Sequence, residues 1–342
     1  MAVTIKDVAE KAKVSIATVS LVIHNHQRIS PETRHRVNKA IQELNYHPSR
    51  NARGLATKQT GNIGFLLTED HFLRSEPFYT RIFLGTEFGA RDFGYYMLLT
   101  TIPSDFTIDK PLPRFVLERT VDGIIIAGKV PDDIITIFAD NDLPMVFTDY
   151  YPASENYPVV LIDNFSGGIH ATQHLINLGH RRIAFIGGDI QHPSIRDRFQ
   201  GYKFALETAG ISSAPEKYII DESYPSRENG YNAIRRLWEN NKDFTAVFAC
   251  NDAMAIGVMQ FLKEKGYRIP KDISLIGFDD VEAGLLLDPP LSTISVPKVE
   301  MGIEAVRLMN AYLQEKNKSP KKVLVPAELI KRSSTGPAGE LM

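Results

Sequence analysis

Residues 4–55 read TIKDVAEKAKVSIATVSLVIHNHQRISPETRHRVNKAIQELNYHPSRNARGL, and their pattern predicts three short helices joined by tight turns. The first helix is signalled by Thr4 with Asp7 three residues later, which is a helix-start pattern. Ser15 is a suitable N-cap for a second helix, which begins shortly after the first one ends. The run SPE at residues 30–32 begins a third helix with a cap, a proline at N1 and an acid in the first turn. The tight joint between the first two helices is typical of a helix-turn-helix.

A fourth helical segment is predicted at SRNARGLAT, residues 49–57, directly after Pro48 has ended the third helix. This segment is short and contains Gly54, so it is not expected to be stable as a free helix. We therefore expect it to form a helix only when a partner stabilises it.

The charge of the chain is unevenly distributed. Residues 1–60 hold ten Lys or Arg and four acidic residues, a balance of +6, which leaves -8 for the remainder of a chain whose total is -2. A basic head on an acidic body suggests that the head alone binds a polyanion. Two alternatives are a solvated basic helix surface and a three-helix module that binds another protein.

The head resembles a known family. VTIKDVAEKAKVSIATVSLVIH, ISPETRHRV and ELNYHPSRNARGLAT are similar, without gaps through residues 3–58, to the DNA-binding head and hinge of the LacI/GalR (lactose-repressor) family. The resemblance implies that the second helix lies in the major groove, where its Ser and Thr hydroxyls and apolar side chains can contact base edges. It also implies that the hinge helices of two subunits enter the minor groove, with Leu55 inserted between base pairs.

The DNA-contacting residues that this resemblance implies are Thr4, Ser15, Ile16, Ala17, Thr18, Ser20, Leu21, His24, Arg28, Asn51, Ala52, Leu55 and Ala56. Several relatives carry Arg or His where this chain has Leu21, so the operator sequence stays open.

From Asn62 the pattern changes to alternating strands and helices. Apolar runs suited to buried parallel strands lie at 62–67, 95–100, 123–127 and 144–148, and a second series starts near Val159, at 159–163, 182–188, 217–220, 246–250 and 273–279. Helices are predicted between them, at 79–92, 110–119, 166–178, 195–209, 228–239 and 252–265. This alternation predicts an α/β fold of two subdomains, each a parallel sheet covered by helices.

The body is similar to the periplasmic sugar-binding-protein fold found in the core of the same family. The resemblance implies a head at 1–46, a hinge at 47–60, a core at 61–332 and a tail at 333–342. Within the core it implies a first subdomain of 61–161 plus 293–322 and a second of 162–292 plus 323–332. An effector cleft between the subdomains would close by a hinge motion.

Polar side chains at strand ends and the family's effector-contacting positions together define the candidate cleft, because ligands in α/β folds bind at the carboxyl ends of strands. An Arg, Asp and Asn set can hydrogen-bond sugar hydroxyls, and aromatic rings can pack on a pyranose. A structural role is the alternative for each residue. The candidates are Phe78, Tyr79, Asp149, Tyr150, Asp189, Ser194, Arg198, Tyr224, Asn251, Asp252 and Asp279. Purine-binding relatives carry Arg where this chain has His192, which favours a sugar over a purine.

Several classes of protein are disfavoured. A single cysteine, Cys250, allows no intrachain disulfide, and no secretory leader or run of apolar residues long enough for a membrane span is found. These features predict a cytoplasmic protein that associates with the nucleoid when bound to DNA. We find no nucleophile elbow, P-loop, dinucleotide motif or metal-ligand spacing, so no cofactor, metal or enzymatic activity is expected.

Together these features predict a dimeric, operator-specific transcription regulator, a repressor of carbohydrate-utilisation genes, gated by a sugar. The tail KRSSTGPAGELM lacks leucine heptads, which favours a homodimer over a tetramer. A non-sugar effector or a phosphoprotein co-regulator remains open. The alternatives from other classes are a cytoplasmic solute-binding protein and an enzyme on an α/β scaffold.

Overall fold

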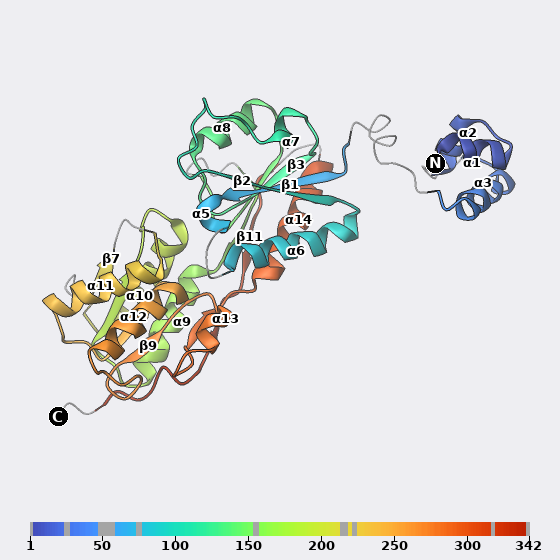
Figure 1. Cartoon of the computed structure of the whole chain (residues 1–342). Helices are drawn as coiled ribbons and strands as arrows, with labels where there is room; N and C mark the ends of the chain where they lie inside the picture. The colour runs from blue at the N-terminus through green and yellow to red at the C-terminus, as the bar shows by residue number, and fades with distance from the viewer. Residues whose placement is uncertain are drawn as a thin grey trace. The chain divides into compact units, whose positions relative to one another are not determined.

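The computed structural model describes residues 3–23, 28–46, 59–72, 77–152, 157–212, 218–220, 224–315 and 319–339. The chain divides into two compact units, Met1–Gly61 and Asn62–Met342. Figure 1 shows a small helical unit and a larger unit built of two α/β lobes.

The small unit, hereafter the head, contains the three predicted helices: α1 (Ile5–Ala12), α2 (Ile16–Ile23) and α3 (Pro31–Glu43). Each helix contributes one fully buried valine to a common core, namely Val8, Val19 and Val37. Ser15 caps α2 as predicted, because its Oγ accepts a hydrogen bond from the Thr18 amide at 3.1 Å. The predicted helix at 49–57 lies outside the described residues.

The first lobe of the large unit is a six-stranded parallel sheet in the order β11-β5-β4-β3-β1-β2. Figure 1 shows the helices on both sides of this sheet, with α7 and α8 on one side and α6 and α14 on the other. Its strands are β1 (Asn62–Thr68), β2 (Tyr96–Ile102), β3 (Gly123–Ala127), β4 (Met145–Thr148), β5 (Val159–Ile162) and β11 (Lys322–Val325), and its helices are α5 (Glu69–Phe72), α6 (Phe78–Phe93), α7 (Arg114–Leu117), α8 (Asp132–Asp140) and α14 (Lys298–Gln314).

The second lobe has a four-stranded parallel sheet in the order β7-β6-β8-β9, with a two-stranded antiparallel ribbon of β10 and β12 beside it. The predicted α/β fold class is thereby confirmed. The strands are β6 (Ile183–Gly187), β7 (Tyr218–Ile220), β8 (Ala246–Ala249), β9 (Ser274–Ile276), β10 (Thr293–Ser295) and β12 (Glu328–Ile330), and the helices are α9 (Asn164–Asn177), α10 (Pro193–Thr208), α11 (Arg227–Asn240), α12 (Asp252–Glu264) and α13 (Glu282–Leu285).

Strand pairing changes the predicted assignment of two strands within the last fifty residues. β11 pairs with β5, so Lys322–Val325 belongs to the first lobe, whereas the prediction assigned 323–332 to the second. β10 pairs with β12, and bridges join this ribbon to the segment that includes β9, so β10 lies with the second lobe rather than the first. The chain therefore crosses between the lobes three times, near Ile162, after Ser295 and after Val325.

Two smaller predictions also need correction. The predicted helix at 110–119 is reduced to α7, because Pro113 disfavours helical geometry in the residue before it. Residues 333–339, assigned to a separate tail, pack into the second lobe. Ser334 is fully buried there, its Oγ donates to the Leu275 carbonyl at 2.6 Å, and its own carbonyl accepts from the Leu275 amide at 2.8 Å.

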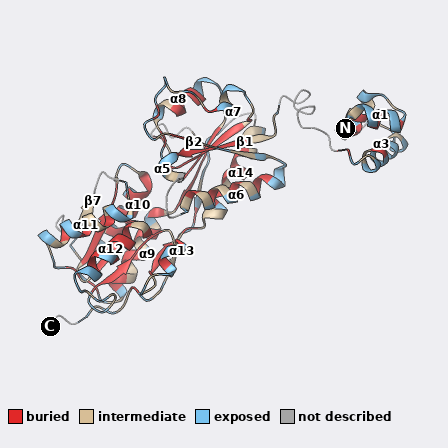
Figure 2. Ribbon diagram, in the orientation of Figure 1, coloured by how far each residue is buried: buried red, intermediate tan, exposed pale blue. Residues whose placement is uncertain are grey.

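Helices on the same face of a sheet approach each other closely at paired glycines. A Cβ on Gly85 in α6 would lie 2.0 Å from the Val299 carbonyl oxygen in α14, and one on Gly302 would lie 2.1 Å from the Ile82 carbonyl oxygen. The same reciprocal arrangement joins α9 to α10 at Gly168 and Gly201, and α11 to α12 at Gly230 and Gly257. These contacts hold the helices against the buried sheets seen in Figure 2, and so fix the strand ends that carry the polar groups.

In the part of the chain that the structure describes, no helix is long and apolar enough to cross a lipid bilayer.

Candidate functional site

A cavity of about 450 Å³ lies between the two lobes. The first lobe contributes residues from α6 and from the ends of β3 and β4, and the second contributes residues from α10 and from the loops after β6, β8 and β9. The predicted residues that line it are Phe78, Tyr79, Asp149, Asp189, Ser194, Arg198, Tyr224, Asn251 and Asp279. The strand-end rule accounts for Asp149, Asp189, Asn251 and Asp279, which lie up to 130 positions apart in the sequence.

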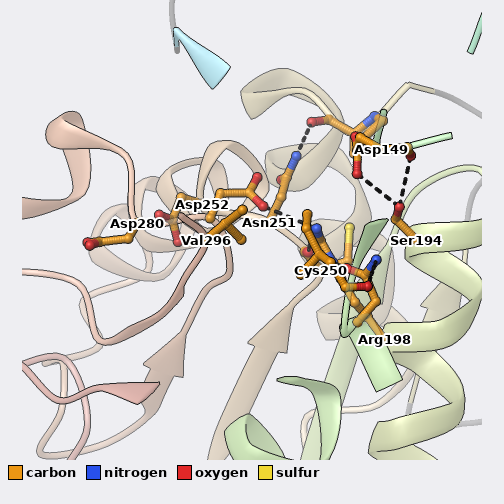
Figure 3. A network of polar contacts seen from close by, with 12 residues as sticks. Asp149, Ser194, Arg198, Cys250, Asn251, Asp252, Asp280 and Val296 are labelled. Carbon is orange, nitrogen blue, oxygen red and sulfur yellow. Dashed lines mark hydrogen bonds and ion pairs between the residues drawn. The ribbon is translucent and has the colours of Figure 1, made fainter. Parts of the chain in front are cut away.

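Asp149 lies at the end of β4 and contacts both lobes. Tyr79, from α6 of the first lobe, donates its hydroxyl to Oδ2 of Asp149 at 2.8 Å. Ser194, from α10 of the second lobe, lies within 3.1 Å of Oδ1 and 3.2 Å of the Asp149 carbonyl oxygen (Figure 3). The buried carboxylate thus joins the lobes on the inner wall of the cavity, and a ligand that competes for it would alter the contact between them.

Arg198 is held in one position by fixed partners, although it lines the cavity. Its side chain is only 5% exposed, its Nε donates to Asn164 Oδ1 at 2.8 Å, and one terminal nitrogen donates to the Cys250 carbonyl at 2.7 Å. The guanidinium also lies over the ring of Phe278, 3.7 Å from its centroid. The other terminal nitrogen lies 3.2 Å from Oδ1 of Asp279, which forms an ion pair across the cavity floor.

Asp279 is the most unusual acid in the cavity. Burial raises its pKa to about 6, although Arg198 and Lys298 act in the opposite direction. Its Oδ1 is buried and lies in ion-pair range of Arg198, but among the described residues it makes no hydrogen bond of good geometry. An acceptor of this kind favours a ligand that donates a hydroxyl, because an unsatisfied buried oxygen is costly.

Lys298 was not predicted as part of this region. It is the first residue of α14 in the first lobe, and its ammonium donates to the carbonyl oxygens of Asp279 and, at 3.2 Å, of Val296. Burial lowers the pKa of this lysine. No sequence pattern marks a helix-initial lysine as a contact between lobes, so only the structure reveals it.

Asp252 and Tyr150 were predicted to contact the effector but do not line the cavity. Asp252 is fully buried behind the wall, where it accepts hydrogen bonds from Thr293 Oγ1 at 2.7 Å and from the Val281 amide at 2.9 Å. Burial, reinforced by the charge of Asp279, raises the pKa of Asp252 to about 8. The loop after β9 folds over this carboxylate, so in this structure Asp252 supports the cavity wall.

Tyr150 is likewise not among the lining residues. It is 9% exposed, and its ring packs against that of His192 with 5.8 Å between the centroids. His192 itself lines the cavity. Burial raises the pKa of the Tyr150 hydroxyl, and the charges of Asp132 and Asp189 raise it further.

Several lining residues were missed by the sequence prediction. Lys129 lies two residues after the end of β3 and 3.4 Å from Asp189 Oδ2 on the opposite lobe, so the strand-end rule could have found it. His71, in α5, stacks on the ring of Tyr79 with 4.6 Å between the centroids. The other missed residues are His192, Ile195, Pro225, Ser226, Arg227, Glu228, Cys250, Ala253 and Val281. Most of them lie in loops or first helical turns, where no periodicity identifies them.

The recognition surface predicted on the head is exposed on α2. Ser15, Ile16, Ala17 and Leu21 are exposed, and Thr18 and Ser20 are half-buried. Thr4 and Arg28 are exposed as well. The backbone amide and hydroxyl of Thr4 both donate to the Asp7 carboxylate, at 2.7 and 2.8 Å. The remaining predicted DNA contacts lie outside the described residues: His24, Asn51, Ala52, Leu55 and Ala56.

Within the described ranges, no group of three or more His, Cys, Asp or Glu side chains is arranged to hold a metal ion.

Both units resemble proteins of known type. Residues 4–49 match the family described as Bacterial regulatory proteins, lacI family, and residues 172–335 match the Periplasmic binding protein-like domain. The chain is 34% identical over 333 residues to the HTH-type transcriptional repressor PurR of Histophilus somni (strain 129Pt). The matched region covers 97% of this chain and 98% of that protein. It is also 34% identical to the Ribose operon repressor of Haemophilus influenzae, again over 97% of this chain and 98% of that protein.

Solved structures share the arrangement over nearly the whole chain. The transcriptional regulator CelR in complex with cellobiose superposes with a TM-score of 0.74 at 30% identity and covers 97% of this chain and 99% of its own. The Lac repressor dimer bound to operator and the anti-inducer ONPF superposes with a TM-score of 0.77 at 28% identity and covers 98% of this chain and 100% of its own.

Proposed function

Because the chain belongs to the lacI family of bacterial regulatory proteins, whose relatives named above are transcriptional repressors, we propose that it represses carbohydrate-utilisation genes under the control of a sugar. In this proposal it binds a pseudo-palindromic operator as a homodimer, in the cytoplasm and on the nucleoid. The observation that carries the proposal is the pairing, in one chain, of a helix-turn-helix head with a cavity between two lobes that is lined by charged and aromatic side chains.

The DNA-binding part of the proposal is supported by the surface of α2. Its exposed Ser side chain can hydrogen-bond to base edges in a major groove, and its Ala and other apolar side chains can contact thymine methyl groups. The +6 charge of residues 1–60 suits the negative charge of a phosphate backbone. The solved Lac repressor dimer, with the same arrangement, is bound to operator. Operator affinity should therefore fall steeply as salt concentration rises.

The sugar part is supported by the chemistry of the cavity. Asp149, Asp279 and Asn251 supply acceptors and a donor, Arg198 supplies fixed donors, and Phe78 and Tyr79 supply aromatic faces. This combination suits adjacent hydroxyls on a pyranose. CelR, a structural neighbour, is solved with cellobiose, and one of the relatives is named for a ribose operon.

Coupling between cavity and head is supported by the residues that join the lobes. Asp149, Lys129 and Lys298 each contact the opposite lobe beside the cavity. A ligand that binds one arrangement of the lobes more tightly shifts the population toward it, by no more than its difference in affinity. We propose that this shift is transmitted through the segment at 47–60 to the head.

Dimerisation is supported by apolar side chains left exposed on the first lobe. Leu84 and Phe88 on α6 are 41% and 44% exposed, and Tyr96 and Leu99 on the edge strand β2 are 61% and 38% exposed. We propose that these exposed apolar side chains belong to an interaction surface. A two-fold dimer through this lobe would bring two heads to the half-sites of one operator.

The test selects binding sites from random DNA with the full chain, and then measures affinity for the selected site by fluorescence anisotropy while sugars are added. We expect a two-fold symmetric consensus and at least one sugar that changes operator affinity by about tenfold, the usual size of an allosteric coupling. The variant Asp279→Asn should keep DNA binding and lose the sugar response. A selection that returns no consensus would refute operator binding, and sugar insensitivity alongside a response to another metabolite would refute the sugar effector.

A further inference from the structure

A second cavity, of about 630 Å³, adjoins the first. The two share His71, Lys129, Tyr224 and Ser226, which therefore mark the junction between an inner and an outer chamber. The outer chamber is further lined by Thr68, Asp70, Ser104, Val130 and Pro131. Each chamber by itself falls within the range of roughly 300–1,000 Å³ that encloses a small ligand. A single sugar ring held in the inner chamber would leave the outer one occupied only by water.

The junction between the chambers has aromatic walls. The rings of His71 and Tyr224 lie 6.4 Å apart between centroids, and His71 stacks in turn on Tyr79. Tyr224 is 40% exposed, so its ring is accessible from the cleft. Flat rings at a passage favour the apolar face of a pyranose, and here they favour it at the point where one sugar unit would be joined to the next.

The outer chamber is built from the carboxyl ends of three neighbouring strands. Thr68 ends β1, Ser104 follows β2 and Lys129 follows β3, and β1 pairs with both of the other strands. This edge is where a parallel sheet collects ligand-binding groups. Hydroxyl, carboxylate and ammonium groups together can both donate to and accept from vicinal hydroxyls.

The charges in and beside the outer chamber disfavour a strongly anionic ligand. Lys129 is its cation, but this ammonium lies 3.4 Å from the Asp189 carboxylate, and Asp70 adds a second acid to the lining. A phosphate placed there would meet two carboxylates and one partly neutralised ammonium. A neutral polyhydroxylated unit meets no such repulsion.

We propose that the outer chamber is a second sugar subsite and that the effector is a disaccharide or a longer oligosaccharide. The inner chamber holds one unit against Arg198 and Asp279, and the junction rings hold the glycosidic linkage. The next unit lies against Thr68, Asp70, Ser104 and Lys129. This proposal rests on the proposed sugar effector and deepens it.

The test is isothermal titration calorimetry of the full chain with matched series of mono-, di- and trisaccharides: glucose with cellobiose and cellotriose, galactose with lactose, mannose with mannobiose, and xylose with xylobiose. The variant Ser104→Phe fills the outer chamber from an exposed position, and Asp279→Asn alters the inner one. Ser212→Phe is the control, because Ser212 is also exposed and lines neither chamber. Thermal unfolding of each variant verifies that it is folded.

In the series that binds, we expect the disaccharide to bind at least about tenfold more tightly than its monosaccharide. Ser104→Phe should remove that advantage and leave the monosaccharide affinity unchanged, Asp279→Asn should weaken both sugars, and Ser212→Phe should weaken neither. A monosaccharide that binds as tightly as its disaccharide, or a disaccharide affinity unaffected by Ser104→Phe, overturns the subsite while sparing the sugar effector. Absence of binding throughout every series overturns both.

Discussion

The exposed face of α2 and the wall of the cavity position their functional side chains in opposite ways. On α2, Ser15, Ile16 and Ala17 are exposed, and a helix start within the same few residues fixes where they lie. In the cavity, Arg198 is 5% exposed and is fixed by Asn164 and Cys250, which are 34 and 52 positions away in sequence. We therefore expect that exposed residues of α2 can be replaced one at a time with little effect on the surrounding structure, whereas residues of the cavity wall also stabilise the lobe.

The strongest test of this difference is Arg198→Ala. It removes the cation from beside the buried Oδ1 of Asp279 and leaves the Asn164 amide oxygen and the Cys250 carbonyl without their donor. Loss of one partner from a buried pair costs about 3–5 kcal/mol, because the remaining charge is uncompensated. We expect the free energy of unfolding in urea to fall by that amount, together with loss of ligand binding.

Arg114→Ala is the matched control, since Arg114 forms a similar ion pair with Glu118 but on the exposed surface of α7. It should leave stability unchanged. The loss of unfolding free energy caused by Arg198→Ala should also be smaller below pH 6, where Asp279 can take up a proton. If the two variants have equal free energies of unfolding, then the buried ion pair contributes no more to stability than the surface pair. The expected difference between cavity residues and surface residues would then be wrong.

The same contrast explains how much of the structure could be predicted from the sequence. Helix starts and apolar periodicity are local signals, so the three head helices and the alternation of strands and helices were predicted correctly. The partner of β11 was not, because β5 lies about 160 positions earlier and strand pairing leaves no local signal.

Candidate cavity residues were predictable where they end a strand, and much less so elsewhere. Asp149, Asn251 and Asp279 follow β4, β8 and β9, and all three line the cavity. Asp252 follows Asn251 directly, but the first turn of α12 carries it behind the wall, and sequence position alone does not distinguish the two. Lys298 contacts the opposite lobe from the first position of α14, and no feature of the sequence distinguishes this helix start from any other.

Asp252, the fully buried acid behind the cavity wall, gives a second, smaller test, based on pH. Burial raises the pKa of Asp252 to about 8 from its ordinary value of 3.8. Between these pH values the native state binds more protons than the unfolded state, so the free energy of unfolding falls as pH rises. A single group of this kind contributes a slope of at most about 1.4 kcal/mol per pH unit. Asp252→Asn should flatten the stability curve between pH 6 and pH 8, measured by urea unfolding.

Asp272→Asn is the control, because the Asp272 pKa has moved in the other direction. The Arg268 guanidinium lowers it to about 2, so the stability it contributes is lost only as pH falls from about 4 to about 2. This variant should lower the free energy of unfolding by a constant amount above pH 5 and leave the slope of the curve there unchanged. If Asp252→Asn also leaves the slope between pH 6 and pH 8 unchanged, then Asp252 is ionised in the folded chain and its burial is compensated by its two hydrogen bonds.

The smallest effect is expected on the head, where Ser15→Ala and Ser30→Ala form a matched pair. Each serine caps a helix, Ser15 at 3.1 Å from the Thr18 amide and Ser30 at 3.3 Å from the Thr33 amide, so each substitution should destabilise the head by about 1 kcal/mol. Amide hydrogen exchange of α2 and α3 in the full chain measures that change. Only Ser15 belongs to the proposed DNA surface, so Ser15→Ala should lower affinity for the selected operator about tenfold, whereas Ser30→Ala should leave it nearly unchanged. Equal losses of operator affinity for the two variants would show that affinity depends on the overall stability of the head and not on a contact made by Ser15. Exposed residues of the head could then be replaced no more independently than residues of the cavity.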